Sequence, residues 1–133
     1  MIVADTSLIS YLLIDGARTA QARLVWQRDA QWIAPLLWRS EFRNILALYH
    51  RRGLLSLEEA IGAAKKGESL LAGREFPVPS RTVLALAAGS GCTAYDCEFV
   101  ALAQTYGVRL VTADGDLAKA FPWTTVSLEA FTA

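Results

Sequence analysis

The first stretch of the chain places an apolar strand, an acid and a helix in direct succession. Ile2–Ala4 is a continuous apolar run, which is typical of a strand buried on both faces. Asp5 follows at once, and the residues from Leu8 onward have helical spacing. In open α/β sheets, ligands bind beyond the carboxyl ends of the strands. Asp5 is therefore the first candidate functional residue, although Asp5, Thr6 and Ser7 are all good helix N-cap residues too.

The rest of the chain alternates short apolar runs with longer stretches of helical spacing. This alternation favours right-handed β-α-β crossovers, and therefore a three-layer α/β/α fold with a mainly parallel sheet. No linker or repeat interrupts residues 1–133, so we expect one domain. Pro35 is expected in the first turn of the third helix. The predicted strands cover 2–4, 32–34, 108–112 and 124–127, an extended segment covers 76–79, and the predicted helices cover 8–13, 17–29, 35–52, 56–72, 80–88, 93–106 and 117–121.

Composition narrows the possible surroundings and partners. The hydrophobic share of 53% predicts apolar surface reserved for a partner or a second copy of the chain. No apolar run approaches the roughly 18 residues of a membrane span, and the first residues lack the basic region of a signal peptide. We therefore expect a cytoplasmic protein in which Cys92 and Cys97 are reduced thiols. The formal net charge is +0, whereas nucleic-acid binders usually have a basic excess. Phosphate affinity would therefore need local arginines or bound metal ions.

A second strand of the predicted sheet also ends near an acid. The run 108–112 is the clearest strand, and Asp114 follows it between Thr112 and Asp116. Because the carboxyl ends of parallel strands meet at one edge of a sheet, Asp5 and Asp114 are expected close together. The alternative is a turn followed by an N-cap, which is at least as favoured for Asp116.

Glu41 lies on an apolar helix face in the predicted third helix. A buried carboxylate without partners is costly, so this position favours a functional role. The alternative is a salt bridge to an arginine from another element. Residues three or four apart share a helix face, and this face contains Leu37, Trp38, Asn44, Ile45 and Leu48.

Asp96 is a fourth acid that shares a face with apolar residues. It lies in the first turn of the helix from Thr93, in line with Phe99, Val100 and Ala103. The alternative is equally favoured, because Thr93 and Asp96 have the spacing of a capping box and an acid there suits the helix dipole.

Taken together, the four acids favour one chemistry. Carboxylates gathered without lysine repel one another unless a cation neutralises them, and Mg²⁺ or Mn²⁺ prefers such oxygen ligands. Such ions activate water and stabilise the oxygens of an in-line displacement at phosphorus. Thr6, Ser7 and Thr112 could orient the acids or a water. The residues therefore predict metal-dependent phosphodiester hydrolysis.

The four acids lie in four motifs along the chain, which are Val-Ala-Asp5-Thr-Ser, Trp-Arg-Ser-Glu41-Phe-Arg-Asn44, Ala-Tyr-Asp96 and Leu-Val-Thr112-Ala-Asp114. These motifs resemble those of a PIN-domain ribonuclease, and more narrowly of the VapC-type toxins of toxin–antitoxin pairs. The resemblance implies a parallel sheet of about five strands and a Mg²⁺- or Mn²⁺-dependent endoribonuclease. It places Asp5, Glu41, Asp96 and Asp114 in the acidic pocket, and Asp116 at a less uniformly functional position. It also implies a homodimer, and an antitoxin that inserts a segment, often with an arginine, into the pocket.

Two arginines lie beside Glu41 in the predicted third helix. Arg39 and Arg43 flank Glu41 and could contact RNA phosphates, although a solvated helix face is favoured for both.

A receiver-like Mg²⁺-binding signalling domain is an alternative to the nuclease. It requires a lysine at a strand end, and Lys65, Lys66 and Lys119 are not at one. A catalytically silent PIN-like scaffold that only binds a partner is another.

Overall fold

Five short parallel strands form the centre of the molecule in the computed structural model, which describes residues 1–133. Each neighbouring pair is parallel, and the order is β3-β2-β1-β4-β5. β1 is central, with β2 and β3 on one side and β4 and β5 on the other. The order of the strands therefore reverses between β1 and β4, which is where open α/β sheets bind ligands. The strands are β1 (Ile2–Ala4), β2 (Trp32–Pro35), β3 (Glu75–Phe76), β4 (Leu110–Val111) and β5 (Thr125–Val126).

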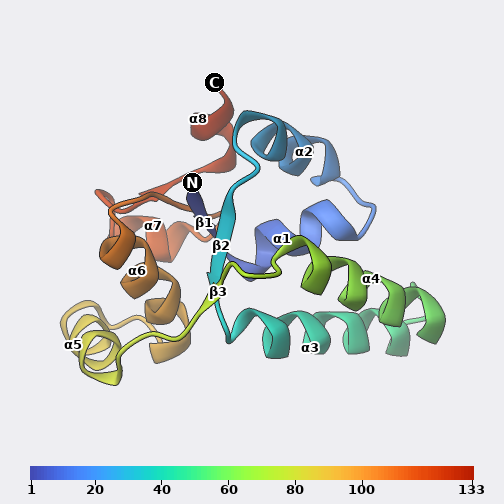
Figure 1. Ribbon diagram of the computed structural model, residues 1–133, viewed down its shortest axis with the longest axis horizontal. Coiled ribbons are helices and arrows are strands. Elements are labelled where there is room, and N and C mark those ends of the chain that lie inside the picture. Colours follow the sequence, from blue (N-terminus) through green and yellow to red (C-terminus); the bar gives the residue numbers. More distant parts are fainter.

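Helices cover both faces of this sheet, so the predicted three-layer α/β/α arrangement is confirmed. In Figure 1, α1 to α4 lie to the right of the strands and α5 to α7 to the left. α1 packs on β1, α6 contacts β1, β2 and β4, and α5 packs on α6. No helix combines the length and the apolar character that crossing a membrane requires. The helices are α1 (Thr6–Leu13), α2 (Thr19–Arg28), α3 (Trp38–Arg51), α4 (Leu57–Leu70), α5 (Ser80–Ser90), α6 (Ala94–Tyr106), α7 (Gly115–Ala120) and α8 (Leu128–Thr132).

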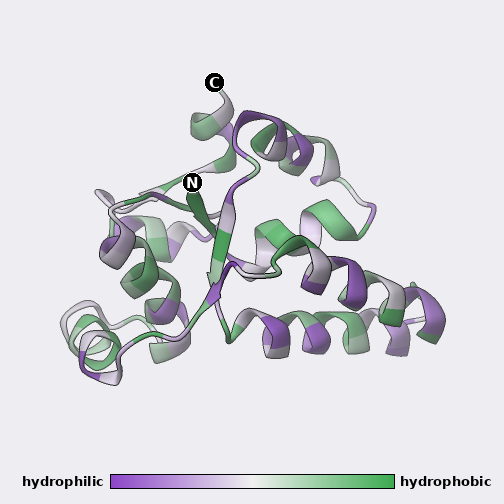
Figure 2. Cartoon of the chain, in the orientation of Figure 1, coloured by the Kyte–Doolittle hydropathy of each residue, from purple (hydrophilic) through white to green (hydrophobic).

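The hydrophobic core is built on the central strands. All three residues of β1 are buried, which explains its unbroken apolar sequence. Figure 2 shows hydrophobic residues concentrated on β1 and mixed colouring along α3 and α4, as expected for helices with one solvated face. Trp38 and Phe42 of α3 are fully buried, and each such side chain contributes about 1.5–3 kcal/mol to stability. This packing fixes the side of α3 on which Glu41 lies.

The start of the third helix differs from the prediction. Pro35 is the last residue of β2, and α3 begins only at Trp38. Ala34 donates its backbone N–H to the carbonyl of Arg74, just before β3, and Leu36 donates to Phe76 of β3, so the residue between them needs no N–H on that side. A proline at a strand end is thus tolerated here. The extended segment expected over 76–79 contributes Phe76 to β3, which begins at Glu75.

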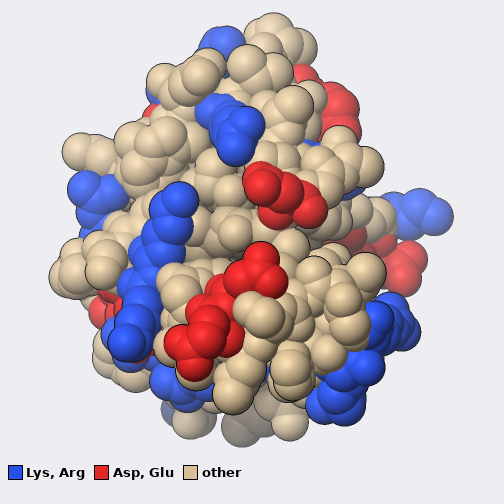
Figure 3. All heavy atoms as spheres, turned by 90° about the vertical axis from the view of Figure 1, so that its right-hand side faces the viewer, with Lys and Arg blue, Asp and Glu red and all other residues tan.

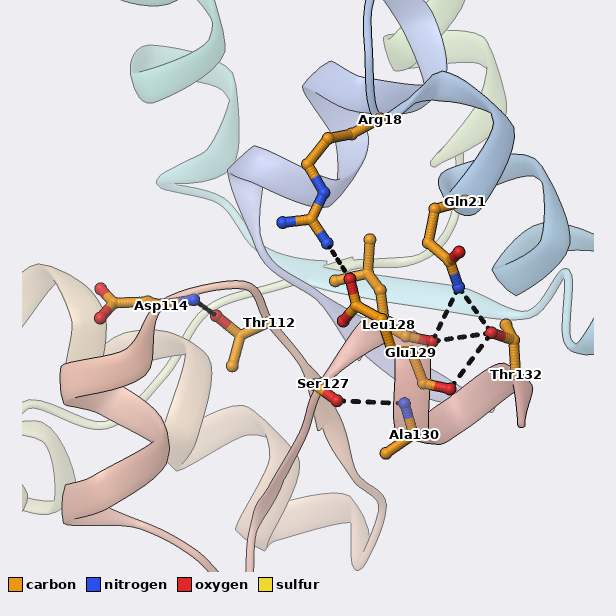
Figure 4. Close-up of polar contacts among 9 residues, drawn as sticks. All are labelled: Arg18, Gln21, Thr112, Asp114, Ser127, Leu128, Glu129, Ala130 and Thr132. Carbon is orange, nitrogen blue, oxygen red and sulfur yellow. Dashed lines mark hydrogen bonds and ion pairs between the residues drawn. The ribbon is translucent and has the colours of Figure 1, made fainter.

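The last helix, α8, was not predicted, and contacts with α2 and the segment before it hold it in place. Arg18 pairs with Glu129 at 2.6 Å, and the Gln21 amide donates to the Leu128 carbonyl at 3.2 Å and to the Thr132 hydroxyl at 2.6 Å (Figure 4). A helix of five residues is too short to show helical periodicity in the sequence, so its formation depends on this packing.

Charged side chains of both signs lie on the face of the molecule shown in Figure 3. Figure 3 shows the right-hand side of Figure 1, where acidic side chains lie near the centre of the face and basic ones are spread around them. This agrees with the formal net charge of +0. General attraction between the whole protein and a polyanion is therefore weak.

Candidate active site

The register of β1 and β4 brings Asp5 and Asp114 to the same edge of the sheet. Ala4 is the partner of Val111, so Asp5 lies beside Thr112. The Thr112 hydroxyl donates to Asp5 Oδ2 at 2.5 Å and accepts the backbone N–H of Asp114 at 3.0 Å, a bond drawn in Figure 4. Thr112 is therefore the link between the two strand ends, and its side chain is buried.

Asp5 caps a helix and also lines the pocket described below. Its Oδ1 accepts the backbone N–H of Leu8 at 2.8 Å, which makes Asp5 the N-cap of α1. Its second oxygen, Oδ2, is held by Thr112 on the side of the pocket. The cap therefore fixes the direction of the carboxylate.

The acid at the start of α7 follows the same pattern. Asp114 Oδ1 accepts the N–H groups of Asp116 and Leu117 at 2.9 and 3.1 Å, so Asp114 is the N-cap and Asp116 is not. Asp116 is exposed and lines the neighbouring hollow, not the pocket that contains Asp5.

Glu41 has no basic partner, so the alternative of a salt bridge is excluded. It is partly buried, and the Thr6 hydroxyl of α1 donates to its Oε1 at 2.7 Å. A neutral hydroxyl orients the carboxylate but leaves its charge uncompensated. Glu41 is thus held by α1 and α3 with its charge available to a ligand.

Asp96 lies in the first turn of α6, as predicted, and is partly buried. The Thr93 hydroxyl caps the helix by accepting the Asp96 backbone N–H at 3.0 Å. No ion pair involves the Asp96 carboxylate.

One pocket of about 270 Å³ contains all four acids. It opens at the carboxyl ends of β1 and β4, between α1, α3, α6 and α7. Ser7, expected to support the site, also lines it, as does Asn44 from the helix face and motif of Glu41. Phe99 and Leu117 line it too, although neither was predicted to be a site residue. The lining residues are Asp5, Thr6, Ser7, Glu41, Asn44, Ile45, Asp96, Phe99, Asp114 and Leu117.

Burial and mutual repulsion make Asp5, Glu41 and Asp96 harder to ionise. The pKa of Asp5 is raised from 3.8 to about 6, chiefly by burial and further by the charges of Asp114 and Glu41, against the hydrogen bonds from Thr112 and Leu8. Burial also raises the pKa of Glu41, helped by the charge of Asp96, and the pKa of Asp96, helped by the charge of Asp114. No lysine or arginine pairs with any of the four. The pocket therefore favours a cation.

The carboxylates of the pocket suit a Mg²⁺ or Mn²⁺ ion that keeps part of its water shell, and not an ion bound by protein ligands alone. No three His, Cys, Asp or Glu side chains converge closely enough to form a complete metal site. These ions commonly bind through one or two carboxylates and keep several waters. A volume of about 270 Å³ accommodates such waters, each of which occupies about 30 Å³ in the liquid.

Glu98 is an acid near the site that sequence reasoning missed. It is partly buried on α6 without an ion pair, and burial together with the charge of Glu41 raises its pKa. The criterion that selected Glu41, an acid on a helix face with apolar residues, also applies to Glu98, which shares a face with the buried Ala101 and Leu102.

Of the two arginines beside Glu41, only one has a free guanidinium. Arg39 binds Glu75 through two hydrogen bonds of 2.7 Å and Glu68 through one of 2.8 Å. Its guanidinium therefore holds α3 against β3 and α4, which differs from the solvated helix face favoured for Arg39. An RNA contact from Arg39 stays a prediction. Arg43 is exposed and forms no ion pair.

Comparisons with known proteins identify the family. The family profile described as PIN domain matches residues 2–121, so this chain belongs to the PIN domain family. Among relatives, the chain is similar to Ribonuclease VapC3 from Pyrobaculum aerophilum, with 32% identity over 124 residues that cover 91% of this chain and 95% of the relative.

Solved structures share the fold. The crystal structure of PAE2754 from Pyrobaculum aerophilum matches with a TM-score of 0.76 at 21% identity, covering 98% of this chain and 92% of that one. FitAcB from Neisseria gonorrhoeae matches with a TM-score of 0.71 at 21% identity, covering 97% and 99%. The PIN-like fold expected from the four motifs is confirmed.

Proposed function

We propose that this chain is a Mg²⁺- or Mn²⁺-dependent endoribonuclease that acts as the toxin of a toxin–antitoxin pair. The observation that carries the proposal is a single pocket in which four carboxylates from four elements meet without a basic partner. The similarity to a relative named Ribonuclease VapC3 supports RNA as the substrate.

Asp5, Asp96 and Asp114 would hold the ion together with waters that it keeps, and Glu41 would complete the site or position a water. Once bound, the ion would supply a water activated for attack and charge stabilisation for in-line displacement at phosphorus. Thr112 and Thr6 orient Asp5 and Glu41 through the hydrogen bonds described above. Such supporting contacts commonly affect metal affinity strongly.

Substrate phosphates need contacts outside the acidic pocket. Arg43, on the exposed side of α3 two residues beyond Glu41, is the candidate for this role. Ser7 and Asn44 line the pocket with neutral polar groups that can hydrogen-bond a phosphate or a water without adding charge.

The test is cleavage of a labelled RNA by purified protein with Mn²⁺, with and without EDTA. Asp5→Asn and Asp96→Asn should abolish cleavage and growth inhibition while circular dichroism stays native, because each removes a metal-binding charge but preserves side-chain shape. Asp15→Asn, at a side chain that is 96% exposed, is the matched control and should cleave normally. Full activity in Asp5→Asn or Asp96→Asn would overturn the proposal.

A hollow that adjoins the acidic pocket fits the expected antitoxin segment. It has a volume of about 370 Å³, shares Ser7 and Ile45 with the pocket, and continues past Ile14 and Tyr49 into a further hollow beside Leu54. A peptide with apolar side chains along this path could place an arginine among the four acids, where the uncompensated charge favours it. Such a peptide should protect against cleavage, and replacing its arginine by glutamine should weaken that protection.

Exposed apolar side chains support self-association as well as antitoxin binding. Large apolar residues remain exposed on several elements, and Trp123 is 92% exposed. We propose a homodimer, to be measured by sedimentation velocity. A monomer at micromolar concentration would contradict it. The other exposed apolar residues include Leu36, Leu54, Leu57, Leu84 and Tyr95.

A catalytically silent PIN-like scaffold is the second candidate function. The observation in its favour is that no three carboxylates form a complete metal site. Calorimetry separates the two candidates, because a silent scaffold predicts no Mn²⁺ binding at millimolar concentration.

A further inference from the structure

Two cysteines flank Thr93 and Asp96 at the start of α6, in positions that bring side chains together. Thr93 is the N-cap of α6, so Cys92 directly precedes the cap and Cys97 is the fourth residue of the helix. Residues at these two positions commonly pack against each other across a helix start. The sequence therefore places two sulfur atoms where the helix geometry favours their contact.

Contacts in the structure agree with this placement. Cys97 is fully buried in a small cluster with Val83 and Ala101, and Cys92 packs against that cluster. The Ser90 hydroxyl accepts the Cys92 backbone N–H at 3.1 Å and lies 3.9 Å from Cys97 Sγ. The Cys97 thiol and the Cys92 backbone thus meet the same hydroxyl group.

The two thiols differ in access, and one of them opens toward the site. Cys92 is partly exposed and lines a hollow of about 570 Å³ whose wall includes Asp96 and Asp114. Cys97 has 0% exposure and directly follows Asp96. A small reagent from solution can therefore reach Cys92 but not Cys97.

We propose that Cys92 and Cys97 form a reversible disulfide with a low-molecular-weight disulfide as oxidant, and that this bridge lowers the metal affinity of the acidic pocket. The first part stands on the cysteine geometry alone, and the second rests on the proposed function. The bridge would draw the Cys97 sulfur away from Val83 and Ala101. Because Asp96 is its neighbour in the first turn of α6, the carboxylate would move with it.

The exchange proceeds in two balanced steps. The Cys92 sulfur attacks one sulfur of glutathione disulfide, so that a mixed disulfide forms and one glutathione leaves as a thiol. The Cys97 sulfur then attacks the Cys92 sulfur and releases the second glutathione. The cysteine pair loses two electrons and two protons, and the glutathione disulfide gains both.

Intact-mass spectrometry of the whole protein after treatment with glutathione disulfide tests the bridge. The wild type should become lighter by two hydrogen atoms and carry no glutathione. Cys97→Ala, which keeps an apolar side chain in the cluster, should stop with one glutathione on Cys92, and Cys92→Ser should not react. A wild type that keeps a glutathione adduct, or that stays unmodified, would overturn the proposal.

Calorimetry with Mn²⁺ tests the coupling to the pocket. The oxidised wild type should bind Mn²⁺ roughly tenfold more weakly than the reduced form, as for other changes beside metal ligands, and dithiothreitol should restore the affinity. Cys92→Ser should bind equally well before and after treatment. Equal affinity of the bridged and reduced wild type would refute the coupling. Failure of the reduced wild type to bind Mn²⁺ would overturn the proposed function, while the mass result still decides whether the bridge forms.

Discussion

Asp5→Asn should stabilise the metal-free protein at neutral pH while removing its activity. Asp5 has a pKa of about 6 in the folded protein and 3.8 as its reference value, so the folded state holds a proton that the unfolded chain releases between these pH values. Stability contributed by this group is present below about pH 4 and is lost as the pH rises through 6. Asparagine has no charge to bury and keeps the oxygen that accepts the Leu8 N–H.

The size of the stabilisation in Asp5→Asn follows from the pKa shift of Asp5. One pKa unit corresponds to about 1.4 kcal/mol, so a rise from 3.8 to about 6 gives up to about 3 kcal/mol of destabilisation above pH 6. Part of this comes from Asp114 and Glu41, whose charges also act on Asp5. The gain in Asp5→Asn is therefore expected between about 1 and 3 kcal/mol, reduced by any weakening of the Thr112 hydrogen bond.

Urea unfolding in EDTA at about pH 4 and about pH 8 measures the effect. The difference in unfolding free energy between Asp5→Asn and wild type should be near zero at the lower pH and fully present at the higher one. Asp15→Asn, at an exposed acid, should show no such pH dependence. The reasoning is refuted if Asp5→Asn is no more stable than wild type at about pH 8.

Three further substitutions test the supports of the site. Arg39→Met should lower the free energy of unfolding in urea by about 1–3 kcal/mol, because it leaves Glu68 and Glu75 without their partner. Arg43→Met on the same helix should change it by less than about 0.5 kcal/mol, and equal effects of the two substitutions would contradict the role of Arg39 in holding α3 against β3 and α4. Gly67→Ala places a Cβ 3.0 Å from a buried indole ring and should be about 1–3 kcal/mol less stable than Gly62→Ala, which meets nothing within 4 Å; thermal unfolding of the pair decides. Thr112→Val should weaken Mn²⁺ binding roughly 10- to 100-fold and Thr112→Ser should restore it, and unchanged binding in the valine variant would argue against the linking role.

Three acids of the pocket stand out in the sequence because each adjoins apolar residues, and Asp114 follows the clearest strand. Asp5 ends an apolar run, and Glu41 and Asp96 share helix faces with core residues. Such acids among apolar residues can be recognised from the amino-acid sequence alone. Parallel strand order then brings the acids together, because carboxyl ends meet at one edge of a sheet.

The partners that fix these acids could not be predicted in the same way. Arg39 meets Glu75, 36 positions away, only after α3 packs beside β3. The hydrogen bond from Thr112 to Asp5 spans 107 positions and depends on the β1–β4 register. Pro35 was misplaced because proline suits both a first helical turn and a strand end, and only the pairing of β2 with β3 decides between them.

The most direct test of the central claim is calorimetric titration of the purified, reduced protein with Mn²⁺ at about pH 6 and about pH 8, in buffers of different ionisation enthalpy. If the four-acid pocket binds the ion, Mn²⁺ should bind with release of protons at the lower pH, since the pKa values of Asp5, Glu41 and Asp96 are raised. Proton release should decline at the higher pH, and Asp96→Asn should bind much more weakly. An absence of binding at millimolar Mn²⁺, or equal binding by Asp96→Asn, would contradict the account.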